Sequence, residues 1–245
     1  MVICRELKLC LVQLPHTGST NLGEHLIKNY GGEKLLAKHS YLDQLRVFRP
    51  EVFKSYRIVG GVRNPLDDRV SSFFKLKSNH LGLYEGKPAE TGLIGGGPYT
   101  RRLRRKIVAE SLDFNEYFLR HVRLIYANPI SILGRRYDFV YRFEEINEGW
   151  DRFFKGIGET WIPMPHGNKT AERSSDFLNY YSRSSQVRAR RIFGPFMEEW
   201  SYEFPDWWAS GSSPSYFELK GALLIRRIQW LSRWPTELRT YWSRL

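Results

Sequence analysis

A short segment near the start of the chain combines residue types that bind anions. It follows an apolar run, precedes a stretch with helical spacing, and consists of Pro15, His16, Thr17, Gly18, Ser19 and Thr20. Backbone N–H groups at a helix N-terminus have no partners within the helix, and the helix dipole is positive there, so such a turn suits a phosphate. Gly18 lets a ligand approach the backbone closely, and Ser19 and Thr20 add hydroxyl donors.

The same segment is not a Walker A motif, because no Gly-Lys-Ser/Thr sequence ends it. This argues against a magnesium-dependent nucleoside triphosphatase. The plainer alternative is a glycine-containing turn between a strand and a helix, as found in any α/β protein.

A second pair of anion-binding residues, Arg63 and Ser71, lies further along the chain. Arg63 directly follows an expected strand over 57–62, and Asn64-Pro65 has the N-cap and first-position residues of a helix. Ser71 then lies about 10 Å along that helix. Arginine binds phosphate through two parallel hydrogen bonds, and serine adds one donor. The alternative is an arginine in a surface ion pair and a serine on a solvated helix face.

Apolar periodicity predicts an alternation of strands and helices. Strands are expected at 8–14, 57–62 and 137–141, and helices at 20–30, from 65, at 114–126 and at 176–200, with long loops at 78–99 and 161–175. This alternation predicts an α/β fold in which helices flank a central, mainly parallel sheet.

Composition limits the kind of protein. The 245 residues, 42% of them hydrophobic, predict one globular catalytic domain over 1–204 and a basic, aromatic helical appendage over 205–245. The net charge of +12 favours anionic partners. Two cysteines, Cys4 and Cys10, indicate neither a disulfide framework nor a metal cluster, so no metal is expected. With no leader or membrane-spanning run recognised, a cytoplasmic protein is expected.

The two anion-binding segments, taken in order, resemble those of the sulfotransferases that use 3′-phosphoadenosine 5′-phosphosulfate (PAPS). Later segments, from Tyr137 to Glu144 and from His166 to Phe204, are similar to the carbohydrate-acting branch. The resemblance covers residues 8 to 204 and implies a three-layer fold similar to that of the P-loop NTPases, PAPS as cofactor, and a hydroxyl acceptor, with a carbohydrate favoured.

The resemblance also assigns site residues. It implies that residues 15–20 bind the 5′-phosphosulfate and that Arg63 and Ser71 bind the 3′-phosphate. Lys169 and Arg173 would close over cofactor or acceptor; the alternative is a solvated basic loop. The family has a lysine where this chain has His16, which donates a hydrogen bond but is a weaker cation near neutral pH.

Several members of the family place a lysine and a catalytic histidine between the two phosphate segments, where this chain has Lys38 and His39, and others use a glutamate. We predict His39 as the base that takes the proton of the acceptor hydroxyl, with His80 and Glu144 as alternatives. Lys38 would replace the lysine missing at position 16. Otherwise His39 is a surface residue at the start of a helix.

Two basic regions allow further hypotheses. Residues 101–106, Arg-Arg-Leu-Arg-Arg-Lys, would attract an acidic glycan acceptor or form a solvated helix face. In the tail, helical spacing and basic or aromatic neighbours predict either a membrane-interface helix or one packed on protein; the apolar positions are Phe217, Gly221, Leu224, Ile228 and Leu231.

Two other functions remain as alternatives to sulfuryl transfer. One is a catalytically impaired relative that binds an anionic polymer or a membrane, and the other is a P-loop small-molecule kinase. Nucleic acid is disfavoured as a partner, because no DNA- or RNA-binding motif accompanies the charge.

Overall fold

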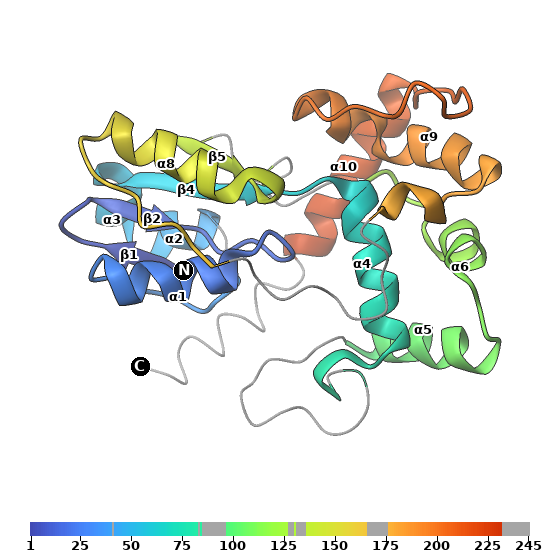
Figure 1. Cartoon of the computed structure of the whole chain (residues 1–245), viewed down its shortest axis with the longest axis horizontal. Helices are drawn as coiled ribbons and strands as arrows, with labels where there is room; N and C mark the ends of the chain where they lie inside the picture. Colours follow the sequence, from blue (N-terminus) through green and yellow to red (C-terminus); the bar gives the residue numbers. More distant parts are fainter. Residues whose placement is uncertain are drawn as a thin grey trace. The chain divides into compact units, whose positions relative to one another are not determined.

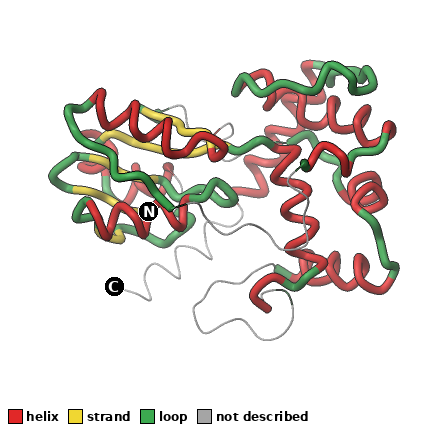
Figure 2. Tube along the Cα trace, in the orientation of Figure 1, coloured by secondary structure: helices red, strands yellow, loops and turns green. Residues whose placement is uncertain are grey.

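The structure is a computed structural model that describes residues 1–40, 42–82, 84, 97–126, 130, 136–165 and 176–231 (Figure 2). These residues form two compact units. The first contains the described residues of 1–64, 127–167 and 215–245, and the second contains those of 65–126 and 168–214. The first unit holds the sheet and the second is helical, so the predicted α/β class is confirmed.

The sheet of the first unit has five strands in the order β3-β1-β2-β4-β5 (Figure 1). Their bounds are β1 Val2–Cys4, β2 Leu9–Leu11, β3 Glu33–Lys34, β4 Arg57–Val62 and β5 Phe139–Arg142. Strands β2, β4 and β5 run parallel, whereas β1 is antiparallel to both β2 and β3. The sheet is therefore mixed, and the prediction of a mainly parallel sheet is corrected.

The antiparallel part results from a tight hairpin at the start of the chain. The Lys8 amide donates to the Arg5 carbonyl at 3.1 Å, and Lys8 has a φ of 45°, which reverses the chain between Cys4 and Leu9. The expected strand over 8–14 consequently shortens to Leu9–Leu11. Val12 continues the ladder by one bond, donating to the Val59 carbonyl at 2.8 Å.

Helices flank this sheet. Helices α1 (Ser19–Asn29) and α8 (Ile146–Gly156) pack against alternate strand residues in one core, and Figure 1 draws both in front of the strands. That core includes Leu9, Leu11, Leu22, Leu26, Val59, Tyr141, Trp150 and Phe154. Helices α2 (Leu42–Phe48) and α3 (Pro50–Ser55) lie behind the strands, on the side to which Cys10 and Ile58 point.

Two glycines in β4 allow tyrosines of the neighbouring segment to cross the sheet surface. A Cβ at Gly61 would lie 2.4 Å from the Cζ of Tyr141, and one at Gly60 would lie 2.6 Å from the Cε1 of Tyr137. Tyr141 therefore passes over β4 and brings its hydroxyl within 3.4 Å of Thr17, beyond the end of β2. The glycines are required by this close approach and not by their backbone angles.

The second unit is built from α4 (Pro65–Lys77), η1 (His80–Gly82), α5 (Pro98–Ala109), α6 (Phe114–His121), η3 (Phe177–Tyr180) and α9 (Arg183–Glu199). An aromatic core joins them, including Phe73, Phe114, Phe118, Tyr181, Phe193 and Trp208. Pro65 starts α4 as predicted, and Asp113 and Glu116 form a capping box at α6. The expected glycine-rich loop over 78–99 is described only in part, because residues 83 and 85–96 lie outside the described residues.

Two expected helices are shorter than predicted. The helix expected over 176–200 is interrupted between η3 and α9, because Tyr181 is extended and Ser182 caps a new helix by accepting from the Ser185 amide. The helix expected over 114–126 ends at His121, and the Tyr126 amide donates to the Ile192 carbonyl at 2.9 Å.

Beyond residue 204 the chain first packs on α9. Trp208 is buried in the second core, and the Arg190 side chain donates to the Ala209 carbonyl at 2.9 Å. The last described helix is α10 (Tyr216–Leu231), assigned to the first unit. Among the helices of the described chain, none has the length and apolar character needed to cross a bilayer.

Candidate functional site

The segment that connects β2 to α1 forms a tight, irregular turn. His16 and Gly18 both have positive φ, at 68° and 70°, and Gly18 occupies the N-cap position of α1. Glycine offers no side chain to cap the helix, and the first turn of α1 contains no acidic residue. The positive end of the helix dipole is thus not neutralised locally, which favours an anion there.

Two hydroxyls of this turn are directed inward. Thr17 and Ser19 are both buried and donate to the Leu14 carbonyl at 2.9 and 2.7 Å. Because a hydroxyl has one hydrogen to donate, the prediction that Ser19 donates to a ligand does not fit this conformation. Thr20 is half-buried and His16 is exposed, so their side chains are more accessible than the hydroxyls of Thr17 and Ser19.

Arg63 lies against the same turn, in the same unit. Its Nη1 is 3.3 Å from the His16 carbonyl oxygen, and its guanidinium carbon is 4.4 Å from the centre of the Phe143 ring. A Cβ at Gly18 would lie 2.9 Å from Phe143, so the glycine also makes room for this ring. Phe143, which sequence reasoning did not single out, therefore contacts both the turn and the arginine.

Glu144 joins the end of β5 to the end of β4. Its Oε1 accepts from the Asn64 amide at 2.7 Å. This bond ties the residue after Arg63 to the residue after Phe143. Glu144, predicted as an alternative base, thus has a structural contact at the point where the two strands end.

His39 is attached to the turn through Gln13. Its Nδ1 lies 2.9 Å from the Gln13 carbonyl oxygen, and the Gln13 side chain donates to the Ser19 carbonyl at 2.9 Å. A carbonyl only accepts, so Nδ1 carries the hydrogen and Nε2 keeps the lone pair. A Cβ at Gly23 would lie 2.6 Å from the Gln13 amide nitrogen, so Gly23 makes room for this positioning residue, which sequence reasoning also missed.

Burial lowers the pKa of the His39 imidazole below its ordinary value of 6.5. The hydrogen bond to Gln13 opposes that shift, and the nearby basic groups, among them Lys38 and His16, add to it. The imidazole is therefore neutral at pH 7. A neutral, oriented histidine with a free lone pair at Nε2 is the state that a general base requires.

These residues meet where three parallel strands end. The turn follows β2, Arg63 follows β4 and Phe143 follows β5, and the carboxyl ends of parallel strands share one edge of a sheet. We call Pro15–Thr20, Lys38, His39, Arg63 and Phe143 the loop site. In open α/β sheets, ligands bind in the crevice outside this edge.

The remaining predicted residues are placed elsewhere. Ser71 is buried in α4, which belongs to the second unit. Lys169 and Arg173 lie outside the described residues. His80, the other alternative base, is in η1 of the second unit. Within the described ranges, no group of three or more His, Cys, Asp or Glu is arranged to hold a metal ion.

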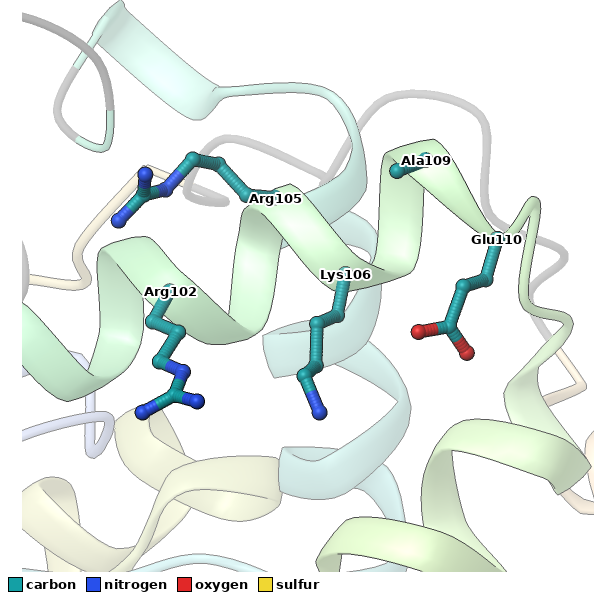
Figure 3. Close-up of a pocket in the computed structure, with 5 residues that line it drawn as sticks. All are labelled: Arg102, Arg105, Lys106, Ala109 and Glu110. Carbon is teal, nitrogen blue, oxygen red and sulfur yellow. The ribbon is translucent and has the colours of Figure 1, made fainter.

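The predicted basic run forms part of α5 and lines a separate pocket. Its volume is about 300 Å³, and its lining residues are Arg102, Arg105, Lys106, Ala109 and Glu110. Figure 3 shows Arg102 and Lys106 extending to the same side of the helix. Glu110 pairs with Arg120 at 3.1 Å, so the positive charges dominate the pocket lining. Leu103 and Ile107 anchor the opposite side of α5 in the core.

Comparisons with protein-family models, curated proteins and solved structures find no match to this chain.

Proposed function

We propose that the chain is a PAPS-dependent sulfotransferase whose active site is the loop site. The observation that carries the proposal is that an anion-binding turn, an arginine and a neutral histidine lie together at the carboxyl edge of parallel strands. On this proposal the sheet unit is a P-loop-like fold with an antiparallel extension formed by β1 and β3.

The loop site fits the phosphate groups of such a donor. The uncapped start of α1 favours an anion, and Arg63, held at the turn by Phe143 and the His16 carbonyl, supplies a fixed positive charge. When bound, the donor supplies an activated sulfuryl group attached to its 5′-phosphate. The sequence resemblance assigns the 3′-phosphate to Arg63 and also to Ser71, which is buried in the other unit. Lys169 and Arg173 remain proposed cofactor contacts on the same ground.

The chain's own residues supply the remaining chemistry. Nε2 of His39 takes the proton from the acceptor hydroxyl, while Nδ1 holds its hydrogen on Gln13 and keeps the ring oriented. Lys38 and His16 are among the basic groups that act electrostatically on His39. We assign to them the charge that develops on the departing bisphosphate.

A carbohydrate is the proposed acceptor class. The α5 pocket has three cationic side chains and no aromatic lining, which suits sulfate or carboxylate groups better than nucleobases. We propose that this surface attracts an acidic glycan. The electrostatic attraction between α5 and such a glycan acts over a long range, so it weakens as salt is added.

A second candidate is a protein that binds the nucleotide without transferring a group. His16 stands where the resemblance leads one to expect a lysine. In addition, the hydroxyls of Thr17 and Ser19 donate their hydrogen bonds to the Leu14 carbonyl and not outward. This candidate predicts binding of the bisphosphate with no product formed from any acceptor. A small-molecule kinase would instead prefer ATP with magnesium.

The test is calorimetric titration with adenosine 3′,5′-bisphosphate, beside adenosine 5′-monophosphate and ATP with magnesium. We expect the bisphosphate to bind tightest and Arg63→Ala to weaken it by about ten- to 150-fold, the range for losing a hydrogen bond to a charged group. Arg57→Ala is the matched control, because Arg57 lies at the opposite end of the same strand. No preference for the bisphosphate would overturn the proposal.

If the bisphosphate binds as expected, turnover with PAPS distinguishes the two candidates. The acceptor panel should include neutral and acidic glycans. Product formation supports the transferase. Tight binding with no product from any acceptor supports the binding protein.

A further inference from the structure

Helix α10 exposes large apolar side chains to solvent. Phe217 is 84% exposed, and Leu224 and Ile228 are each 58% exposed. Single exposed apolar residues are common on soluble proteins, but a contiguous apolar patch marks a surface that binds something. The feature therefore needs a partner.

The exposed residues form one stripe along the helix. Leu224 follows Phe217 by seven residues and Ile228 follows Leu224 by four, which places all three on the same face. On the opposite face, Leu219, Ala222 and Leu223 are half-buried. One apolar face of α10 is thus already partly covered, and a second apolar face points outward.

The sequence of α10 is more basic than acidic. Helix α10 contains three basic residues, Lys220, Arg226 and Arg227, and one acidic residue, Glu218. Lys220 is exposed, and its Nζ lies 5.3 Å from the centre of the Tyr216 ring. Tyr216 is exposed as well, at the start of the helix. Exposed aromatic and basic residues beside an apolar stripe are typical of helices that lie in a membrane interface.

The charge of the protein distinguishes between two possible partners of this apolar face, a second copy of the chain and a lipid bilayer. The helix carries a net positive charge, and the whole chain carries +12. A second copy of the chain would bring like charges together, whereas an anionic bilayer attracts each basic residue. Because charged residues recur along α10, the helix suits the plane of the interface, where they remain among the headgroups.

We propose that α10 attaches the protein to anionic lipid bilayers by inserting Phe217, Leu224 and Ile228 between the headgroups. This attachment is independent of the proposed transfer reaction, because none of these residues belongs to the loop site.

The test is sedimentation of the full chain with two kinds of vesicle, one of phosphatidylcholine alone and one that also contains phosphatidylserine. We expect binding to the phosphatidylserine vesicles, weakening with salt. Replacing Phe217, Leu224 and Ile228 together by glutamine should lower the affinity for these vesicles at least about tenfold, because the variant no longer gains the free energy of moving three apolar side chains out of water. The three side chains are exposed, so the circular dichroism spectrum and thermal unfolding should be unchanged.

The matched control replaces three exposed apolar residues elsewhere by glutamine: Val47, Val108 and Val187. The control variant should bind vesicles as the original chain does. Three outcomes would overturn the proposal: equal binding of the α10 triple variant, equal binding to both kinds of vesicle, or no vesicle binding at all. Dimerisation that the α10 variant abolishes, without vesicle binding, would identify a second copy as the occupant instead.

Discussion

Replacing Gly61 by alanine tests how the structure brings Tyr141 to the turn after β2. The new Cβ would lie 2.4 Å from Cζ, 2.5 Å from Cε2 and 2.7 Å from the hydroxyl oxygen of Tyr141. Carbon atoms in contact normally lie about 3.5–4.0 Å apart, so the ring or the strand must move by about 1 Å. Tyr141 is 1% exposed and packs against the fully buried Trp150, so the ring has little room.

Two losses contribute to the expected destabilisation. Overpacking a core position costs about 1–3 kcal/mol. Displacing the Tyr141 hydroxyl also breaks its contact with Thr17, a buried hydrogen bond worth about 0.5–1.5 kcal/mol. We therefore expect Gly61→Ala to lower the free energy of unfolding by about 1.5–4.5 kcal/mol.

Urea denaturation followed by circular dichroism measures this change. Gly156→Ala is the matched control, because a Cβ at Gly156 meets no atom within 4 Å, and it should not destabilise the protein, since alanine is the better helix former at the end of α8. In a Tyr141→Leu background the ring atoms are gone, and Gly61→Ala should then cost much less. If the full cost persists in that background, the clash with Tyr141 is not its cause.

The other predictions concern the loop site and α5. Because burial holds the pKa of His39 below 6.5, the acid limb of the kcat/KM profile should fall below pH 6.5, and an acid limb above pH 7 would contradict His39 as the base. Since the unfolded chain takes up this proton first, His39 also makes the fold less stable as pH falls below about 6.5, and His39→Gln should remove that part of the pH dependence in urea titrations. Lys38→Ala should reduce the turnover number far more than it reduces the affinity for the bisphosphate, which calorimetry measures. Equal losses of turnover and affinity would argue against the proposed role of Lys38. Replacing Arg102, Arg105 and Lys106 by glutamine should lower retention on an immobilised sulfated polysaccharide and its salt dependence, and unchanged retention would indicate a merely solvated face.

Local signals predicted those parts of the fold where neighbouring residues determine the structure. Strand β4 has the predicted bounds, and α4 begins at Pro65, because an apolar run and a proline at the first helical position act through the nearby backbone. The sequence also indicated that the turn over 15–20 follows a strand and precedes a helix, and that Arg63 directly follows β4.

What sequence reasoning missed depends on contacts between distant residues or on unusual backbone angles. The antiparallel pairing of β1 follows from a positive φ at Lys8, a residue type that gives no signal for it. The inward donation by Ser19 depends on the path of the turn through His16, which also has positive φ. Phe143 and Gln13 gain their roles only when β5 and α1 are in place.

The order of segments in the sheet unit has a consequence during synthesis. Strand β4 ends at Val62, but its parallel neighbour β5 begins only at Phe139. At a translation rate of roughly 5–20 residues per second, the ribosome needs about 4–15 s to make the intervening chain. For that time one edge of β4, with its apolar residues Ile58, Val59 and Val62, has no strand to pair with. The nascent protein therefore exposes this edge to aggregation while the first part of its helical unit, residues 65–126, is being made.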